Sequence, residues 1–401
     1  MSTFPGRNPS GLPQPDDDAR VHAARVRSHI RQRIEAGDGW IPFAVFMDLA
    51  LHAPGLGYYA AGSQKFGREG DFVTAPEMTP LFGRALARQV AEILEYTGGE
   101  ILELGGGTGV LAVDILGELD HLGLLPARYR ILEPSAELAQ RQRQRIHQSL
   151  PTMIDRVEWM DRLDGLESSP AGFRGVVIAN EVLDALPVHI LAWRQEGVFE
   201  RGVALKGDKL VWEDRPASCS LQAAAEGLGL SIADCEVPYV SEVCPAMTDL
   251  VTRLAQSIDR GAVLMIDYGF PRAEYYHPQR NGGTLMCHYR HHVHDDALFL
   301  PGLQDITAHV DFTAVAEAGV DAGCQLAGYT TQAQFLLNCG ITELLARTPA
   351  DDVAAYLPQS TAVQKLLSPA EMGELFKVLA LSRGIDAPLL GFAEGDRIGR
   401  L

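Results

Sequence analysis

The chain has 401 residues, of which 46% are hydrophobic, and a formal net charge of −18. Its length allows a large core and exceeds one average domain, so one enlarged domain or two are expected. The acidic balance argues against a nucleic-acid-binding protein, whose phosphate contacts need clustered Lys and Arg, and no apolar run approaches the roughly 20 residues of a membrane span.

The chain is expected to begin with a disordered lead-in followed by one helix. Residues 1–18 are rich in Pro, Gly and Asp and lack the apolar core of a secretion signal, which suggests a cytoplasmic protein. An arginine-rich helix is predicted over residues 19–35, with its arginines in solvent. The apolar positions expected to seat this helix on the body of the protein are Val21, Ala24, Ile30 and Ile34.

A glycine-rich turn follows a buried strand and opens a helix. Gly105, Gly107 and Gly109 allow a sharp turn and a close approach of the backbone to a ligand. Val110 occupies the place of the third glycine of a dinucleotide fingerprint, and Glu103 lies two residues before the first glycine. Both departures favour S-adenosyl-L-methionine over NAD. The alternatives are a tight connection without a ligand and, more distantly, an NAD-dependent oxidoreductase.

The next two predicted strands also end in acids. Glu133 follows Gly107 by 26 residues, close to the ~20-residue interval at which such folds place a ribose-binding carboxylate. We therefore expect Glu133 to accept hydrogen bonds from both ribose hydroxyls, although an exposed strand-end acid has the same pattern. Asp161, just past the following strand, is placed either to meet the adenine or to cap a helix.

The end of the fourth predicted strand is expected to carry reacting groups. The buried run over residues 175–179 delivers Asn180 and Glu181 to the crevice where α/β sheets bind their ligands. The alternative is that Asn180 only caps a helix, but a cap does not require the neighbouring Glu181 or Asp184, three residues after Glu181. Asp267 ends the next strand and is expected at another wall of the same pocket.

Strands and helices alternate along the chain, which predicts an α/β fold with a parallel sheet and helices on both faces. The expected core strands are residues 100–104, 129–133, 156–160, 175–179 and 262–267, and the expected helices are 109–119, 135–149 and 246–258. Alternating runs over 188–214 predict an inserted β-meander. The C-terminal third adds expected helices at 312–318 and 333–345, and strands at 325–330 and 375–381 that would close the sheet as an antiparallel pair.

Cysteine and histidine patterns give no metal site. The six cysteines lack a C-x-x-C pair, and we expect reduced, mostly buried thiols. Four histidines crowd into residues 288–296, but their spacing fixes no ligand set. A non-metal loop lining the substrate entrance is the expected structure of that segment.

Five strings of the sequence, taken together, resemble the MidA family of class I S-adenosyl-L-methionine-dependent methyltransferases. This family includes the mitochondrial protein-arginine methyltransferase needed for assembly of respiratory complex I. The strings are residues 70–77 (GDFVTAPE), 103–109, 180–188 (NEVLDALPV), 266–269 and 304–312 (QDITAHVDF). The resemblance runs from about Ile41 to Leu381 without a missing block.

The resemblance implies a Rossmann-like methyltransferase core with S-adenosyl-L-methionine as cofactor and no metal. The implied cofactor-binding residues are Asp71, Thr74, Glu103, Gly105, Gly107, Gly109, Glu133, Asp161 and Asn180. If the acceptor is arginine, Glu181 resembles the first of the paired acids that hold its guanidinium. Asp184, His309 and Asp311 are candidates for the second partner and for proton removal.

The resulting organisation has five consecutive segments: a lead-in (1–18), an N-terminal helical and lid segment (19–98), a cofactor-binding core (99–187), a β-rich insertion (188–245) and the remainder of the core with C-terminal helices (246–401). The expected partner is a protein substrate, with no nucleic acid and no membrane insertion. The sequence leaves the oligomeric state open, with a homodimer as one option. A small-molecule methyltransferase and a cofactor-binding assembly scaffold with little turnover remain as alternative functions.

Overall fold

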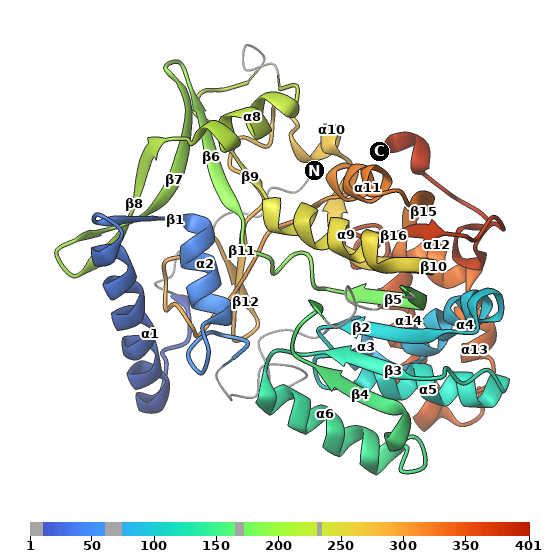
Figure 1. The fold of residues 1–401 in the computed structure, drawn as a ribbon. Helices are drawn as coiled ribbons and strands as arrows, with labels where there is room; N and C mark the ends of the chain where they lie inside the picture. The colour runs from blue at the N-terminus through green and yellow to red at the C-terminus, as the bar shows by residue number, and fades with distance from the viewer. Residues whose placement is uncertain (1–10, 61–73, 165–171, 231–234) are drawn as a thin grey trace. The chain divides into compact units, whose positions relative to one another are not determined.

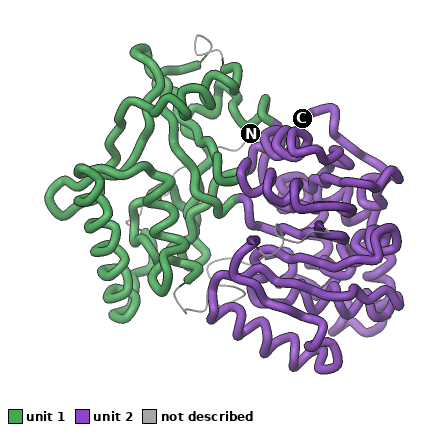
Figure 2. The backbone as a smooth tube through the Cα atoms, in the orientation of Figure 1, with its two compact units in different colours: residues 1–72, 184–247, 272–309 green, residues 73–183, 248–271, 310–401 purple. Residues whose placement is uncertain are grey.

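The computed structural model describes residues 11–60, 74–164, 172–230 and 235–401. The chain divides into two compact units (Figure 2). Unit 1 comprises residues 1–72, 184–247 and 272–309, and unit 2 comprises residues 73–183, 248–271 and 310–401. This division differs from the five consecutive segments inferred from the sequence, because the chain passes between the units several times.

Unit 2 contains an eight-stranded mixed sheet (Figure 1). Its order is β15-β16-β10-β5-β2-β3-β4, with β14 paired to β10. The strands are β2 (Glu100–Leu104), β3 (Tyr129–Leu132), β4 (Val157–Met160), β5 (Phe173–Asn180), β10 (Ile258–Phe270), β14 (Val310–Asp311), β15 (Gln325–Thr331) and β16 (Phe376–Arg383). The run from β10 to β4 is parallel, whereas β15 and β16 pair in antiparallel fashion and close the sheet beside β10. The α/β fold, the five core strands and the antiparallel closing pair are therefore confirmed.

Helices cover both faces of this sheet. The helices of unit 2 are α3 (Ala75–Met78), α4 (Pro80–Thr97), α5 (Val110–Leu122), α6 (Ala136–Ser149), α9 (Pro245–Ser257), α11 (Phe312–Asp321), α12 (Gln332–Asn338), α13 (Ile341–Leu345) and α14 (Val353–Leu367), with short 3-10 turns at Ile154–Arg156, Leu390–Phe392 and Ile398–Arg400. Val378 and Ala380 of β16 share one core with apolar residues of α4, α5, α12, α13 and α14. Leu381, one position on, lies against Gly319 of α11, so α11 covers the opposite face.

Two helical stretches depart from the sequence-based expectation. The helix predicted over 333–345 is broken, because Gly340 takes a left-handed conformation (φ 75°) between α12 and α13. The sequence analysis assigned the residues of the amphipathic helix α4 to the N-terminal helical and lid segment (19–98). The structure shows that the buried side chains of α4 belong to the core of unit 2. Pro80 at its first turn and Gly98 after its last residue delimit this helix.

Unit 1 contains the predicted β-meander, which the structure confirms. Its elements are α1 (Asp17–Ala36), β1 (Trp40–Pro42), α2 (Phe43–His52), β6 (His189–Arg194), β7 (Gly197–Lys206), β8 (Lys209–Pro216), α8 (Cys219–Gly227), β9 (Tyr239–Val243), α10 (Arg272–Tyr275), β11 (Met286–Tyr289), β12 (His292–His294) and β13 (Asp305–Thr307). Strands β1-β7-β6-β9 form one sheet with β8 paired to β7, and β12-β11-β13 form a second. The sequence did not predict the short strands β1, which pairs with β7, and β9, which pairs with β6.

The buried stripe of α1 differs from the expected one. Ile30 and Ile34 are buried as predicted, but Val21 is 54% exposed and Ala24 is also exposed. The other two buried positions are Ala23 and Val26, which complete an i, i+3, i+7, i+11 stripe with the isoleucines.

The histidine-rich segment is a β-hairpin, so the expected loop is wrong. Strands β11 and β12 pair across Arg290 and His291, which both have positive φ (47° and 62°), as a tight hairpin turn requires. Within the described residues, no group of three or more His, Cys, Asp or Glu side chains is arranged to hold a metal. Three of the six cysteines are buried, namely Cys287, Cys324 and Cys339. None of the helices described by the structure has both the length and the apolar character needed to cross a bilayer.

Candidate active site

The centre of the unit 2 sheet has a topological switch point. Strand β2 lies between β3 and β5, and the chain continues outward from β2 to β3 and β4 on one side, whereas β5 and β10 extend the sheet on the other. Because the crevice of an open α/β sheet forms where the strand order reverses, ligands bind outside the carboxyl ends of the strands there. The glycine turn after β2 and the Asn180-Glu181 pair at the end of β5 both lie at this point.

The glycine turn has the conformation that its sequence predicts. Gly105, Gly107 and Gly109 have φ of 62°, 51° and 81°, which L side chains rarely adopt. A Cβ on Gly107 would meet no atom within 4 Å, so this part of the turn has open space beside it. Helix α5 starts at Val110 and is not capped by a side chain of Gly109, so its first amide groups are available to a ligand. Thr108 donates a hydrogen bond to Glu77, which anchors the turn from outside.

Glu133 is held in place at the end of β3. One carboxylate oxygen accepts a hydrogen bond from the backbone N–H of Ser135 (2.9 Å) and the other from Nε2 of Gln142 (3.0 Å). Glu133 is only 8% exposed, and burial raises the pKa of its carboxyl above the ordinary value. A carboxylate fixed in this way is oriented before any ligand binds.

Gln142 of α6 connects this carboxylate to the glycine turn, and sequence reasoning missed it. Its Nε2 also donates to the carbonyl oxygen of Gly107 (3.0 Å), and its Oε1 accepts from Nε1 of Trp159 (2.9 Å). A Cβ on Gly109 would lie 3.2 Å from the Cα of Gln142, so glycine is needed there for helix α6 to approach. No sequence motif marks Gln142, which follows Glu133 by nine residues and is buried in α6 together with Ala139 and Ile146.

The sequence suggested that the side chain of Glu103 reaches toward the turn, but the structure shows it buried. It is 2% exposed and accepts a hydrogen bond from the Tyr129 hydroxyl (2.8 Å). Burial is the main cause that raises the pKa of Glu103 to about 7; the Tyr129 hydroxyl opposes this rise and the nearby Glu133 carboxylate adds to it. Near neutral pH this site is therefore poised to ionise when a cation approaches.

This raised pKa predicts a pH-dependent stability. The carboxyl of Glu103 ionises near its ordinary value of 4.5 in the unfolded chain but only at about 7 in the folded protein. Its stabilising contribution is thus complete below pH 4.5 and is lost as the pH rises through about 7. We expect Glu103→Gln to raise the free energy of unfolding at about pH 8 by an amount on the order of 3 kcal/mol, and to change it little near pH 4.

Urea unfolding at the two pH values measures this difference, with Glu95→Gln, an exposed acid at the end of α4, as the matched control. An effect of Glu103→Gln that is the same at both pH values would contradict the assignment.

Asn180 and Glu181 end β5 in an unusual conformation. Glu181 has φ of 52°, the left-handed region that a non-glycine residue enters only at a cost of about 1–3 kcal/mol. Its backbone N–H donates to the Ile266 carbonyl (2.9 Å), and Asn180 Nδ2 donates to Glu181 Oε1 (3.4 Å). The Oδ1 atom of Asn180 is buried and accepts no hydrogen bond from any residue that the structure describes. An orphaned acceptor beside a strained acid is typical of a ligand-binding site.

Asp267 supports this strand end rather than forming a wall of the pocket. It is fully buried, and its carboxylate accepts hydrogen bonds from the backbone N–H groups of Leu183 and Tyr268, each at 2.9 Å. The first of these bonds holds the segment that follows Glu181. In the same segment, the side chain of Val182 lies 3.3 Å from the Cβ position of Gly105, so the two strand ends at the switch point are in contact.

Four further residues were expected at the site, and the structure describes three of them. Thr74 is partly buried just before α3, and Asp161 is exposed after β4. Asp311 uses one carboxylate oxygen to cap α11, accepting from Thr313 (3.1 Å) and Ala314 (3.2 Å). Asp71 lies outside the described residues.

Two further candidates belong to unit 1. The carbonyl of Asp184 accepts a hydrogen bond from Ala308 (3.0 Å), next to His309. His309 itself is anchored to Thr284, whose hydroxyl oxygen accepts from its backbone N–H (3.1 Å) and whose carbonyl lies 3.3 Å from Nδ1. These contacts bring Asp184 and His309 to the same part of unit 1.

The described residues of unit 2 fit a cofactor with a ribose and a charged tail. Glu133 offers two oriented acceptors for ribose hydroxyls, and the glycine turn and the α5 N-terminus offer backbone N–H groups. Glu103 and the orphaned Asn180 Oδ1 offer acceptors to an ammonium group.

Comparison with known proteins gives consistent results. Residues 85–330 match the family model described as "Putative S-adenosyl-L-methionine-dependent methyltransferase". A crystal structure of a superfamily member from Burkholderia thailandensis, described as a "likely methyl transferase" and bound to S-adenosyl-homocysteine, is 48% identical with a TM-score of 0.92. The match covers 98% of this chain and 100% of that one. A second structure from the same organism is 46% identical with a TM-score of 0.89, over the same shares of both chains.

Curated relatives are more distant. "Protein arginine methyltransferase NDUFAF7, mitochondrial" from Bos taurus is 30% identical over 88% of this chain and 82% of its own length. The protein of the same name from Danio rerio is 29% identical over 89% of this chain and 86% of its own length. These relatives are mitochondrial by name, so the cytoplasmic location expected from the sequence is wrong on this comparison. That expectation relied on the lack of a secretion signal, which does not distinguish among other compartments.

Proposed function

Because the chain belongs to the family of S-adenosyl-L-methionine-dependent methyltransferases, we propose that it methylates an arginine side chain of a protein. The single observation that carries the proposal is the strained Glu181, held at φ 52° at the switch point of the sheet, beside the orphaned Oδ1 of Asn180. The names of the curated relatives support the choice of acceptor, at 28–30% identity.

The residues of unit 2 would hold the cofactor as follows. Glu133 takes the ribose hydroxyls, the glycine turn lies against the methionine portion, and Glu103 and Asn180 accept hydrogen bonds from its ammonium group. Asp161 is proposed for the adenine, and Thr74 and Asp71 for the amino acid end. When bound, S-adenosyl-L-methionine supplies an electrophilic methyl group on a sulfonium.

The clamp made by Gln142 predicts a loss of cofactor affinity on substitution. Gln142→Leu keeps the volume of the side chain but removes its bonds to Gly107, Glu133 and Trp159. With the carboxylate and the turn no longer fixed, we expect the Kd of S-adenosyl-homocysteine to rise about 10- to 100-fold, equivalent to about 1–3 kcal/mol.

Isothermal titration measures this Kd. The neighbouring exposed Gln144→Leu is the matched control and should change it less than about twofold. Equal effects of the two substitutions on this Kd would show that Gln142 does not position the glycine turn.

We propose that carboxylates bind and orient the arginine that accepts the methyl group. A guanidinium is permanently protonated and presents its N–H donors in a planar fork, which a carboxylate meets with two hydrogen bonds. We propose that Glu181 fixes one edge of the guanidinium, so that a terminal nitrogen faces the methyl group. Orientation of this kind contributes about 7–11 kcal/mol to lowering such barriers. Asp184 and His309 are proposed for the second contact and for proton removal, ahead of Asp311, because one oxygen of Asp311 already caps α11.

We propose that the protein substrate is a subunit of respiratory complex I. This step rests on the resemblance to the MidA family and on the relatives named NDUFAF7. A small-molecule acceptor is the rival, since the fold is shared by both classes of methyltransferase.

The test is to incubate the purified protein with lysate and S-adenosyl-L-methionine carrying a labelled methyl group. Mass spectrometry then identifies the labelled residue. Label on arginine of a complex I subunit is the expected result. Label on lysine, or only in the small-molecule fraction, would overturn the arginine proposal and leave the family assignment intact.

A further inference from the structure

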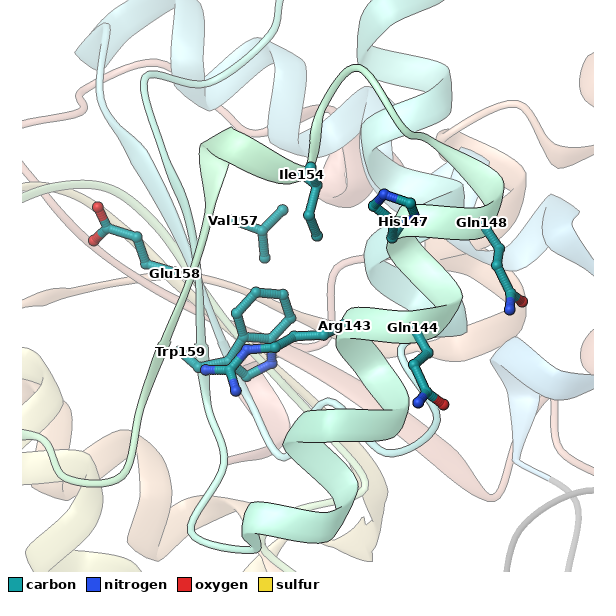
Figure 3. Close-up of a pocket in the computed structure, with 8 residues that line it drawn as sticks. All are labelled: Arg143, Gln144, His147, Gln148, Ile154, Val157, Glu158 and Trp159. Atoms are coloured by element: carbon teal, nitrogen blue, oxygen red, sulfur yellow. The ribbon is translucent and has the colours of Figure 1, made fainter.

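A groove lies at the edge of the unit 2 sheet, away from the switch point (Figure 3). It has a volume of about 780 Å³ and is lined by Arg143, Gln144, His147 and Gln148 of α6 and by Ile154, Val157, Glu158 and Trp159 of the segment leading into and forming β4. This volume is within the range of ligand sites, and the groove is open rather than enclosed. An open groove fits an extended chain better than a small molecule.

The groove presents one cation, Arg143, that has no partner acid in the described part of the chain. Arg143 lies over the Trp159 ring, with its guanidinium carbon 4.7 Å from the ring centroid, and no acid among the described residues forms an ion pair with it. The acid that lines the groove, Glu158, points away from the other labelled side chains in Figure 3 and pairs with Arg128 (3.1 Å) and Arg130 (3.4 Å). On a chain of net charge −18, an arginine that lies over an aromatic ring and has no partner carboxylate attracts an acidic partner.

The backbone beside the groove can accept another strand. β4 ends the sheet order, and no other strand of the described chain pairs with its outer side. The Met160 carbonyl accepts a hydrogen bond from Glu133 on the inner side (2.9 Å). Because successive backbone groups of a strand alternate in direction, the N–H and C=O of Trp159 point outward, away from β3.

Trp159 also connects the groove to the cofactor site. Its Nε1 donates to Gln142 Oε1 (2.9 Å), and Gln142 in turn holds the Gly107 carbonyl and the Glu133 carboxylate, each at 3.0 Å. A ligand that fixes the Trp159 ring would therefore fix the Gln142 clamp.

We propose that this groove binds an extended acidic segment of a partner protein, which adds as a strand to β4, places a carboxylate on Arg143, and tightens the cofactor site through Trp159 and Gln142. Main-chain hydrogen bonds to β4 supply affinity, and the apolar floor of Ile154 and Val157 takes alternate side chains of the segment. The proposal is independent of which acceptor the enzyme methylates.

The first test uses a fluorescent heptapeptide of alternating Glu and Val. We expect it to bind the whole protein with a Kd below about 1 mM, and a matched Lys and Val peptide to bind at least about tenfold more weakly. Arg143→Glu should weaken binding of the acidic peptide by at least about tenfold. Arg25→Glu, an equal change of net charge at an exposed position of α1, should change it less than about twofold. No binding, or equal losses in the two variants, would overturn the proposal.

The mode of binding is tested by hydrogen exchange. Addition of a strand should slow exchange of the Trp159 amide when the acidic peptide binds, because this N–H would become hydrogen-bonded. Binding without added protection in β4 would overturn the strand-addition mode.

The coupling is tested with Trp159→Phe. This variant keeps a ring under Arg143 but removes the N–H that bonds to Gln142, so peptide binding should persist within about threefold. In the unaltered protein the acidic peptide should tighten S-adenosyl-homocysteine binding about fivefold, and in Trp159→Phe it should have no effect. Equal coupling in both proteins, or none in either, would contradict the connection through Trp159.

Discussion

Glu181→Gln is expected to lower the rate of methyl transfer about 100- to 1,000-fold while leaving the Kd of S-adenosyl-homocysteine within about threefold. The amide keeps the shape of the side chain but loses the charge and one of the two acceptors that a guanidinium requires. The defect should therefore appear in single-turnover measurements of the chemical step and not in cofactor titrations. This separation distinguishes a catalytic carboxylate from a structural one.

Two variants serve as controls for this result. Glu196→Gln removes an exposed acid from the turn between β6 and β7 and should leave the rate unchanged. Glu181→Gly relieves the positive φ and should raise the free energy of unfolding by about 1 kcal/mol while remaining as inactive as the glutamine variant. Full activity in either Glu181 variant would remove this residue from the reaction, and cellular function that survives Glu181→Gln would favour the scaffold alternative.

The sequence predicted the parts of the site that local chemistry determines. Strand ends are marked by apolar runs that stop at a polar residue, so Gly105, Glu133 and Asn180 could be assigned to the carboxyl edge of the sheet before the structure was known. These strand ends are neighbours because β2 lies between β3 and β5, a strand order that the sequence did not predict. Glu103 was placed on the correct strand, but its burial against Tyr129 depends on the pairing of β2 with β3.

The supporting residues could not be predicted, because nothing in their own neighbourhood marks them. Gln142 lies in a helix whose other glutamines and arginines are mostly exposed, and only the packing of α6 against Gly109 turns it inward. Asp267 looked like a pocket acid because it ends a strand, yet its oxygens bond to backbone groups. The tight turn at Arg290 and His291 was missed for a similar reason, since neither residue is a usual choice for positive φ.

Glu133→Ala is expected to raise the Kd of S-adenosyl-homocysteine about 100-fold or more. The substitution removes both oxygens offered to the ribose. It also removes the acceptor to which Ser135 and Gln142 donate hydrogen bonds, so Gln142 no longer connects this position to the glycine turn. Glu133→Gln keeps one acceptor, so it should raise this Kd about tenfold, to a value between those of the unaltered protein and of Glu133→Ala. Isothermal titration at neutral pH gives all three values.

The same carboxyl adds a pH test with a defined sign. Burial raises the pKa of Glu133, and a ribose prefers the ionised form as acceptor, so cofactor affinity should fall as the pH drops through this raised value. Glu137→Gln, an exposed acid in the first turn of α6, is the matched control and should retain both affinity and pH profile. A Glu133→Ala variant that binds S-adenosyl-homocysteine as tightly as the unaltered protein would show that Glu133 does not hold the ribose.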